Sequence, residues 1–305
     1  MVANRYYLSQ QALQMYGFTN QPFQYTNTTK EIYFDPIIQS VVEKWVQQIS
    51  AQEAFYLLTG AKGSGKSSFG KLIALHGSSK SELHTVFLTC SPVNTPIDFL
   101  SLLVEQSQFQ SKDNVKQLTN KAAKETYQQL KNGILPIYIL DNAHSLQTKV
   151  LVEIVKFCSS FTELGLTCPR LIMCGNVEDI KHKLEGHPAP LVVQNKFTVL
   201  SCPALDYSQM HSYLQFKFAN AGIMNSTKLI SMLPAERLME CRGNFQKLNE
   251  IVVGLLEDNL LTELPIANNE IKKQPKLTYL QQNKVSVISL VVLVIIGLLI
   301  QILLN

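Results

Sequence analysis

A glycine-rich loop lies between an apolar run and a stretch of helical periodicity at residues 54–68, AFYLLTGAKGSGKSS. Its residues 60–67 satisfy the pattern G-x-x-x-x-G-K-[ST] at every fixed position. The flanking runs predict a buried strand before the loop and a helix after it, which is the order that a phosphate-binding loop needs. A chance match in a Gly/Ser-rich loop is the alternative, and it would leave both flanking elements unexplained.

Two side chains and several backbone groups of this loop are predicted to hold a nucleotide. The glycines let the backbone turn tightly and point N–H groups at a β-phosphate, while the next helix adds the positive end of its dipole. Lys66 would bridge the β- and γ-phosphates and the Ser67 hydroxyl would bind Mg²⁺, so ATP and Mg²⁺ are the expected ligands. The predicted nucleotide-binding residues of the loop are Gly60, Gly63, Ser64, Gly65, Lys66, Ser67 and Ser68.

Four more short apolar runs follow the loop, and a helical pattern separates each from the one before it. They lie at residues 85–90, 136–141, 170–175 and 197–202. Short apolar strands that alternate with helices predict a parallel sheet with helices on both faces. We therefore expect an α/β fold of the P-loop NTPase type with a five-stranded parallel sheet. Beyond Pro203 only helical patterns remain, which predicts a C-terminal all-helical lid.

The C-terminal residues differ in composition from the rest of the chain. Residues 285–304 hold no charged side chain in twenty positions and would span about 30 Å as a helix, which is the thickness of a bilayer's hydrocarbon. We expect a single transmembrane helix here, with a buried core helix as the alternative. Lys272, Lys273, Lys276 and Lys284 flank its N-terminal side and predict that the bulk of the chain lies in the cytoplasm, at the inner membrane.

The expected organisation divides the chain into five parts. They are an N-terminal extension at residues 1–35, a nucleotide-binding core at 36–203, the helical lid at 204–261, a polar linker at 262–284 and the apolar segment at 285–304. The first residues, MVANRYYLSQQ, contain no apolar run of the kind that a signal peptide has. Only Asn305 follows the apolar segment, so we expect no folded part beyond the membrane.

Composition argues against several classes of function. The net charge of +4 comes from scattered lysines and not from one basic stripe, which argues against nucleic-acid binding. The six cysteines form no C-x-x-C pair, and dispersed cysteines of this kind are typical of reduced core thiols. We therefore expect neither a disulfide framework nor a zinc site.

Polar residues after the third and fourth predicted strands complete the expected site. The run IYIL ends in Asp141, and an apolar strand that ends in a carboxylate is typical of the group that holds the Mg²⁺ shell. Asn176 follows the fourth strand, where it either senses the γ-phosphate or caps a turn or helix. His144 is either a catalytic base close behind Asp141 or a loop histidine with a structural hydrogen bond.

Five segments within residues 14–255 carry a resemblance to a known family. They are MYGFTNQPFQYT, LLTGAKGSGKSS, YILDNAHSL, LIMCGNVEDI and CRGNFQKLNEI. Together they resemble the ExeA/GspA-type AAA+ ATPases of general secretion, a group that includes DamX-type and MshM-type cell-envelope proteins. The resemblance implies ATP binding at the inner membrane and a protein partner in the envelope. Several members carry a membrane helix after the ATPase domain, and we expect this chain to differ from them in lacking the periplasmic peptidoglycan-binding domain that usually follows.

Departures from the family pattern bear on catalysis. Asn142 stands where the family has a glutamate that polarises the attacking water, and an amide can orient water but cannot accept its proton. Residues 175–196, where an arginine finger would be expected, contain lysines but no arginine. Gln246 replaces the lid's sensor arginine, and Arg242, about one helical turn earlier, is a candidate substitute. A finger contributes roughly 10³ to 10⁵ in rate, so these changes predict slow hydrolysis or nucleotide binding alone.

Three functions follow as hypotheses. The leading one is a membrane-anchored AAA+ protein that uses ATP as fuel or switch on secretion or cell-envelope machinery. The second is a catalytically weak scaffold in which bound nucleotide orders a partner-binding surface. The third is a DNA-linked, transposition-type ATPase, against which the scattered lysines and the apolar segment count. A homo-oligomer is compatible with each hypothesis.

Overall fold

The computed structural model describes residues 6–24, 31–52, 55–104, 114–185 and 197–261. The chain up to Asp258 forms one compact unit. The expected linker and apolar segment at residues 262–304 lie outside the described residues. Within the described part of the chain, no helix is both long and apolar enough to cross a membrane. The expected transmembrane helix therefore stays a prediction.

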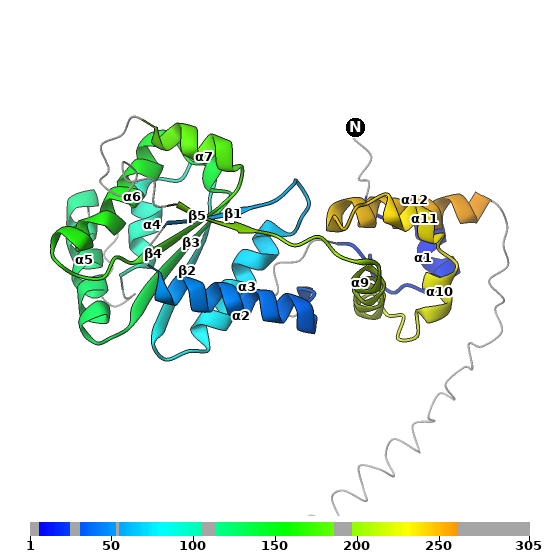
Figure 1. Ribbon diagram of the computed structural model, residues 1–305. Coiled ribbons are helices and arrows are strands. Elements are labelled where there is room, and N and C mark those ends of the chain that lie inside the picture. The colour runs from blue at the N-terminus through cyan, green and yellow to red at the C-terminus, as the bar shows by residue number, and fades with distance from the viewer. Residues whose placement is uncertain (1–5, 25–30, 53–54, 105–113, 186–196, 262–305) are drawn as a thin grey trace, which may run out of the picture. The chain divides into compact units, whose positions relative to one another are not determined.

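Five parallel strands form one sheet in the order β2-β3-β4-β1-β5 (Figure 1). They are β1 Phe55–Thr59, β2 Leu83–Thr89, β3 Leu135–Asp141, β4 Arg170–Cys174 and β5 Phe197–Ser201. This confirms the predicted five-stranded parallel sheet of a P-loop NTPase. Because all strands run in the same direction, the residues that follow β1, β3 and β4 meet at one edge of the sheet, where ligands bind in open α/β folds.

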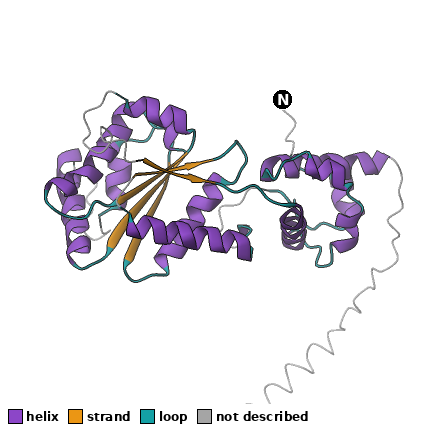
Figure 2. Ribbon diagram, in the orientation of Figure 1, coloured by secondary structure: helices purple, strands orange, loops and turns teal. Residues whose placement is uncertain are grey.

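Helices cover both faces of this sheet (Figure 2). Successive strand residues point to opposite faces of the sheet. Tyr138 and Leu140 belong to a large cluster of buried apolar side chains on one face, while Ile139 and Cys174 lie against Gly70 on the other face. The helices of the larger cluster are α4 Pro96–Leu102, α5 Val115–Lys131, α6 Thr148–Glu163 and α7 Val177–Leu184, and those of the other face are α2 Pro36–Ala51 and α3 Lys66–Ser78. Burial on both faces explains why the strands read as continuous apolar runs.

Among the described residues, four helices follow the sheet and form the helical lid, with α1 from the N-terminal part beside them (Figure 1). They are α9 Tyr207–Asn220, α10 Thr227–Ser231, α11 Ala235–Met239, α12 Phe245–Leu261 and α1 Gln10–Tyr16. The rings of Phe18 and Phe218 lie 5.2 Å apart, and the Tyr16 hydroxyl donates to Leu256 O at 3.0 Å. No sequence pattern indicated this contact between the N-terminal residues and the lid.

Asp35 connects the segment before α2 to the lid. One carboxylate oxygen accepts from the Ile38 N–H at 2.7 Å and so caps α2, whose first residue is Pro36. The other oxygen accepts from Gln209 Nε2 of α9 at 3.0 Å and from the Tyr33 hydroxyl at 3.0 Å. The residue that caps α2 thereby also fixes Tyr33 beside α9.

Candidate functional site

A tight loop joins β1 to α3 at the carboxyl edge of the sheet. Gly63 and Gly65 have φ of 82° and 87°, in the left-handed region that glycine adopts without strain. Gly65 caps α3 and offers no side chain to its first N–H groups, which leaves them to an anion. A Cβ on Gly60 would lie 2.4 Å from Ser64 Oγ, so the buried Ser64 packs against the base of the loop.

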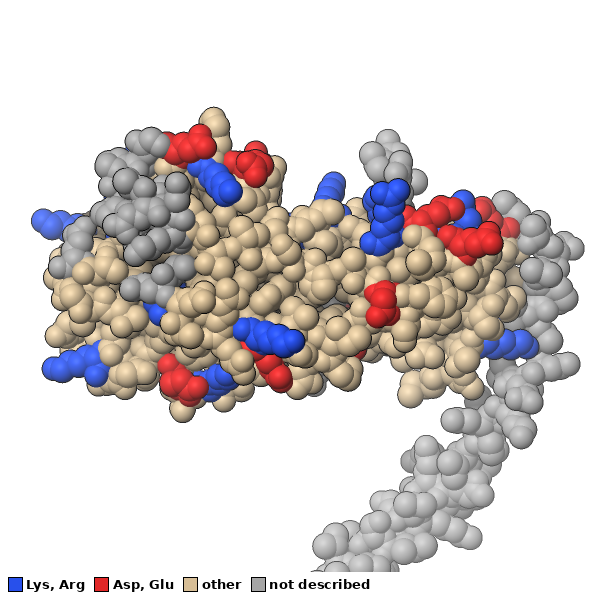
Figure 3. Space-filling model, in the orientation of Figure 1, with Lys and Arg blue, Asp and Glu red and all other residues tan. Residues whose placement is uncertain are grey.

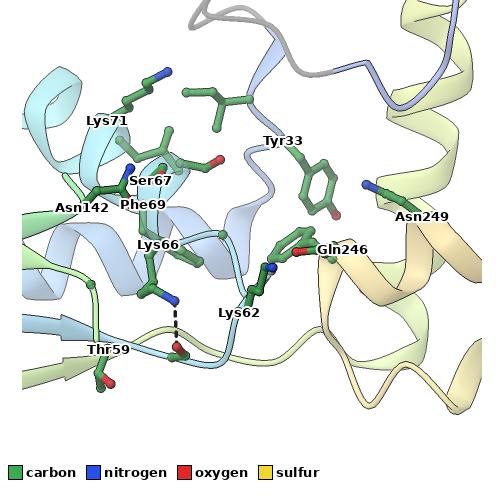
Figure 4. A pocket seen from close by; sticks show the side chains of 18 of the residues that line it. Tyr33, Thr59, Lys62, Lys66, Ser67, Phe69, Lys71, Asn142, Gln246 and Asn249 are labelled. Carbon is green, nitrogen blue, oxygen red and sulfur yellow. Dashed lines mark hydrogen bonds between the residues drawn. The ribbon is translucent and has the colours of Figure 1, made fainter. Parts of the chain in front are cut away.

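The ammonium of Lys66 folds back onto this loop. Its Nζ donates to Gly60 O at 2.8 Å and to Ala61 O at 3.0 Å (Figure 4). An ammonium has three donors, so two bonds to the backbone leave one for a ligand while they hold the positive charge in place. The Lys66 ammonium is thus held at the loop with a donor left for a phosphate group.

Ser67 and Asp141 are in contact although 74 positions separate them in the sequence. Ser67 Oγ donates to Asp141 Oδ1 at 3.0 Å. Asp141 is 3% exposed, and this burial raises the pKa of its carboxyl, against the lowering effects of the Ser67 hydroxyl and the Asn142 N–H. A hydroxyl and a carboxylate side by side supply hard oxygen ligands, so the pair fits Mg²⁺.

A cavity of about 1000 Å³ opens over these groups, at the upper end of the range for ligand sites. Its walls come from the phosphate loop, the ends of β3 and β4, the segment before α2, and the lid helices α9 and α12 (Figure 4). The predicted residues that line it are Gly60, Gly63, Gly65, Lys66, Ser67, Ser68, Asn142, His144 and Asn176, whereas Ser64, Asp141 and Arg242 do not. Asp141 reaches the cavity through its bond to Ser67.

Asn142 has a left-handed backbone, with φ 58° and ψ 36°. Asparagine tolerates this region better than most residues that have a side chain, which is a structural reason for asparagine at this position. His144 follows in the short 3-10 turn η2 Ala143–Ser145, and its Nδ1 is buried with no hydrogen-bond partner among the described residues. The structural hydrogen bond expected of this histidine is made by its backbone oxygen, which accepts from Lys183 Nζ, and not by its ring.

Lys183 of α7 and Asn176, the N-cap of that helix, lie at the turns beside the cavity. Lys183 donates to the backbone oxygens of His144 and, at 2.6 Å, Leu146. Both of these bonds of the Lys183 ammonium lie inside its own chain. Asn176 accepts from the Glu178 N–H at 3.1 Å, which shows the helix cap, and it also lines the cavity. The cap and the contact with a phosphate are therefore compatible roles of Asn176.

The lid places its residues differently from the sequence expectation. Gln246 N–H donates to Gly63 O at 3.1 Å, while its side-chain Nε2 binds the Tyr6 hydroxyl and, at 3.3 Å, Glu250 Oε1. Arg242 is exposed with φ 50° and precedes α12, which begins only at Phe245. Arg242 therefore does not share a helix with Gln246 and does not line the cavity, and its role as a substitute for the sensor arginine stays a prediction.

Sequence reasoning missed the aromatic wall of the cavity. The rings of Tyr33 and Tyr213 lie 5.4 Å apart, and those of Tyr213 and Phe245 lie 5.1 Å apart. Burial raises the pKa of both tyrosines and lowers the pKa of Lys217, whose Nζ lies 5.9 Å from the Tyr213 ring. Such a surface suits a planar base. No sequence signal could have found it, because its residues come from three segments far apart in the chain.

Comparisons of the sequence with known proteins identify the domain type. Residues 49–180 match the family model of an AAA domain, so this part of the chain is an AAA-type P-loop domain. The matched range contains the phosphate loop, Asp141 and Asn176. No curated protein matches the sequence.

Solved structures share the fold. Cdc6p from Pyrobaculum aerophilum has a TM-score of 0.55 and 11% identity, over 75% of this chain and 64% of that one. The ORC1 protein of Aeropyrum pernix, solved in complex with DNA, has a TM-score of 0.50 and 13% identity, over 76% of this chain and 65% of that one. The chain thus spans just under two thirds of the length of these proteins. At this identity the likeness shows the fold alone.

Changing Asp141→Asn should stabilise the empty protein and remove its response to Mg²⁺. Above the raised pKa of Asp141 its carboxyl is ionised in both states, but only the folded state removes the charge from water. The ionised group therefore lowers the free energy of unfolding. We expect a higher melting temperature for the variant at pH 8, and a difference that shrinks as the pH falls through the raised pKa. Adding Mg²⁺ to the ADP-bound protein should then raise the melting temperature of the wild type further, and should leave that of Asp141→Asn unchanged.

Asp98→Asn is the matched control for this experiment. Hydrogen bonds from Thr95 lower the pKa of Asp98, so its ionised form stabilises the fold at pH 8 and the amide should not raise the melting temperature. Equal melting temperatures for the wild type and Asp141→Asn at pH 8, or a full Mg²⁺ response in that variant, would contradict the assignment of Asp141.

Proposed function

We propose that this chain is an AAA+ ATP-binding protein, anchored in the inner membrane, that acts on secretion or cell-envelope machinery and hydrolyses ATP slowly. The observation that carries ATP binding is the convergence of Lys66, Ser67 and Asp141 beside one cavity, with 3.0 Å between Ser67 Oγ and Asp141 Oδ1. When bound, Mg²⁺ would neutralise phosphate charge there. The aromatic wall of Tyr33 and Tyr213 supports a nucleotide over a small anion, because it lines the same cavity as the loop and suits a planar base.

Three features support slow hydrolysis. Asn142 lines the cavity with an amide, which is too weak a base to accept a proton from water. Gln246, at the place of the sensor arginine, is neutral and bonded to Tyr6 and Glu250. Lys183 is bonded to two backbone oxygens. These residues favour retention of bound nucleotide, so a nucleotide-dependent scaffold or switch is the second candidate function.

Lys66→Ala should weaken ATP binding by about 10- to 100-fold, which is the effect of losing a charged hydrogen-bond donor to phosphate. Lys62→Ala is the control, because Lys62 also lines the cavity but is not a fixed position of the loop pattern. Calorimetry with Mg·ATP on the full-length chain in detergent measures both. Equal affinities of the wild type and Lys66→Ala would refute the proposed site.

Asn142→Glu should raise Mg·ATP turnover about tenfold or more, since general-base catalysis typically contributes 10² to 10⁴ and the missing finger limits the gain. The control is Asn142→Gln, which imposes the same strain at φ 58° without a carboxylate. Steady-state phosphate release measures the rates. A wild type that turns over several ATP per second and a slower glutamate variant would show that another group activates the water, with His144 the first to examine.

Attachment to the membrane is proposed from the sequence of residues 285–304. Deleting residues 282–305 should release the protein from carbonate-washed membranes, because this removes the longest apolar run of the chain. A control deletion of residues 266–281 shortens the linker and should leave the protein in the membrane pellet. If the first truncation still sediments with washed membranes, the anchor lies elsewhere.

The partner in the envelope is proposed from the resemblance to the ExeA/GspA group alone. The DNA-linked alternative has less support. On the face of the described residues drawn in Figure 3, basic and acidic side chains are interspersed, so this view offers no basic stripe for a phosphate backbone. Self-assembly stays a proposal that is compatible with the AAA-type domain.

A further inference from the structure

The first turn of α12 is bound directly to the phosphate loop. Asn244 Nδ2 donates to Lys62 O at 2.9 Å, although the two residues are 182 positions apart. The other end of the same side chain, Oδ1, accepts from the Lys247 N–H at 3.0 Å and so caps α12. Asn244 is 9% exposed, and both polar ends of its side chain are satisfied by these bonds.

Neighbouring residues of α12 make this contact close. Gln246 N–H donates to Gly63 O at 3.1 Å, and a Cβ on Gly63 would lie 2.2 Å from Gln246 Cβ. A Cβ on Gly65 would lie 3.4 Å from the Phe245 ring. The loop glycines therefore serve two purposes, because they give the loop its left-handed turns and they also make room for the lid (Figure 4).

Peptide geometry gives the Asn244 bond a consequence for the ligand. In a trans peptide the C=O and the next N–H point in opposite directions, so the pull on Lys62 O turns the Gly63 N–H away from Asn244. Gly63 lines the cavity and Asn244 does not. The bond therefore fixes the direction of the Gly63 N–H, a donor of a loop that lines the cavity and whose N–H groups would bind a β-phosphate.

We propose that Asn244 is a positioning residue that pre-organises the phosphate loop for nucleotides with a β-phosphate. This inference rests on the proposed nucleotide binding. Asparagine suits the place because one side chain supplies both an acceptor for the helix N–H and a donor for the loop carbonyl. Serine and aspartate cap helices as well as asparagine does, but neither offers the amide donor. The cap and the loop contact can therefore be separated by substitution.

The test compares Asn244→Ser with Asn114→Ser in the full-length chain in detergent. Asn114 is a matched control, because it caps α5 in the same way, with Oδ1 accepting from Gln117 N–H at 3.0 Å, and does not line the cavity. The probes are ADP, and AMP as a nucleotide without a β-phosphate. We expect Asn244→Ser to bind ADP about three- to tenfold more weakly, as for one lost hydrogen bond, with AMP unchanged. Asn114→Ser should leave both affinities unchanged.

Two results would overturn the proposal. Equal weakening of ADP and AMP would mean that Asn244 only packs the lid, and unchanged ADP affinity would mean that the loop is organised without it. Asn244→Thr also caps a helix without supplying an amide donor or a charge, so it carries the same test should Asn244→Ser fail to fold. A wild type that binds no ADP would instead refute the proposed nucleotide binding. Measuring Lys66→Ala with the same ADP probe separates the two cases, because that variant should lose affinity only if the phosphate loop binds the nucleotide.

Discussion

The hydrogen bond between Ser67 and Asp141 depends on the whole sheet. β4 separates β1 from β3, so the loop after β1 and the carboxylate at the end of β3 meet only if all three strands are parallel and in register. The same arrangement buries Asp141, which raises the pKa of its carboxyl, while the Ser67 hydroxyl and the charges of Lys71 and Lys66 act in the opposite direction. The fold thus places a carboxylate oxygen where it would serve as a ligand for Mg²⁺ bound with the phosphates.

Core and lid are coupled through the backbone of the phosphate loop. Asn244 and Gln246 bind two consecutive carbonyls of that loop, and Gln246 is in turn bonded to Tyr6 from the N-terminal part. Asp35 makes a second connection, from the cap of α2 to Gln209 on α9. A ligand that shifts the loop therefore acts on the N-terminal residues and the lid at once, which is the coupling that a nucleotide-dependent switch needs.

We propose slow hydrolysis from residues that also make structural contacts. Asn142 adopts a left-handed turn, Lys183 donates to the backbone after β3, and Gln246 is bonded to Glu250. The experiments on binding and on turnover are therefore separate for this chain.

The sequence by itself determined the strand, loop and helix around Lys66, the five-stranded parallel sheet, and Asp141 at a strand end. Those features follow from apolar periodicity and glycine spacing, which are read along the chain. Only the tertiary structure decided the contact of Phe18 with the lid, the aromatic wall at Tyr213, and the bond from Asn244 to Lys62. These contacts join residues that are far apart in the sequence, and no local pattern indicates which distant segment a buried side chain will contact.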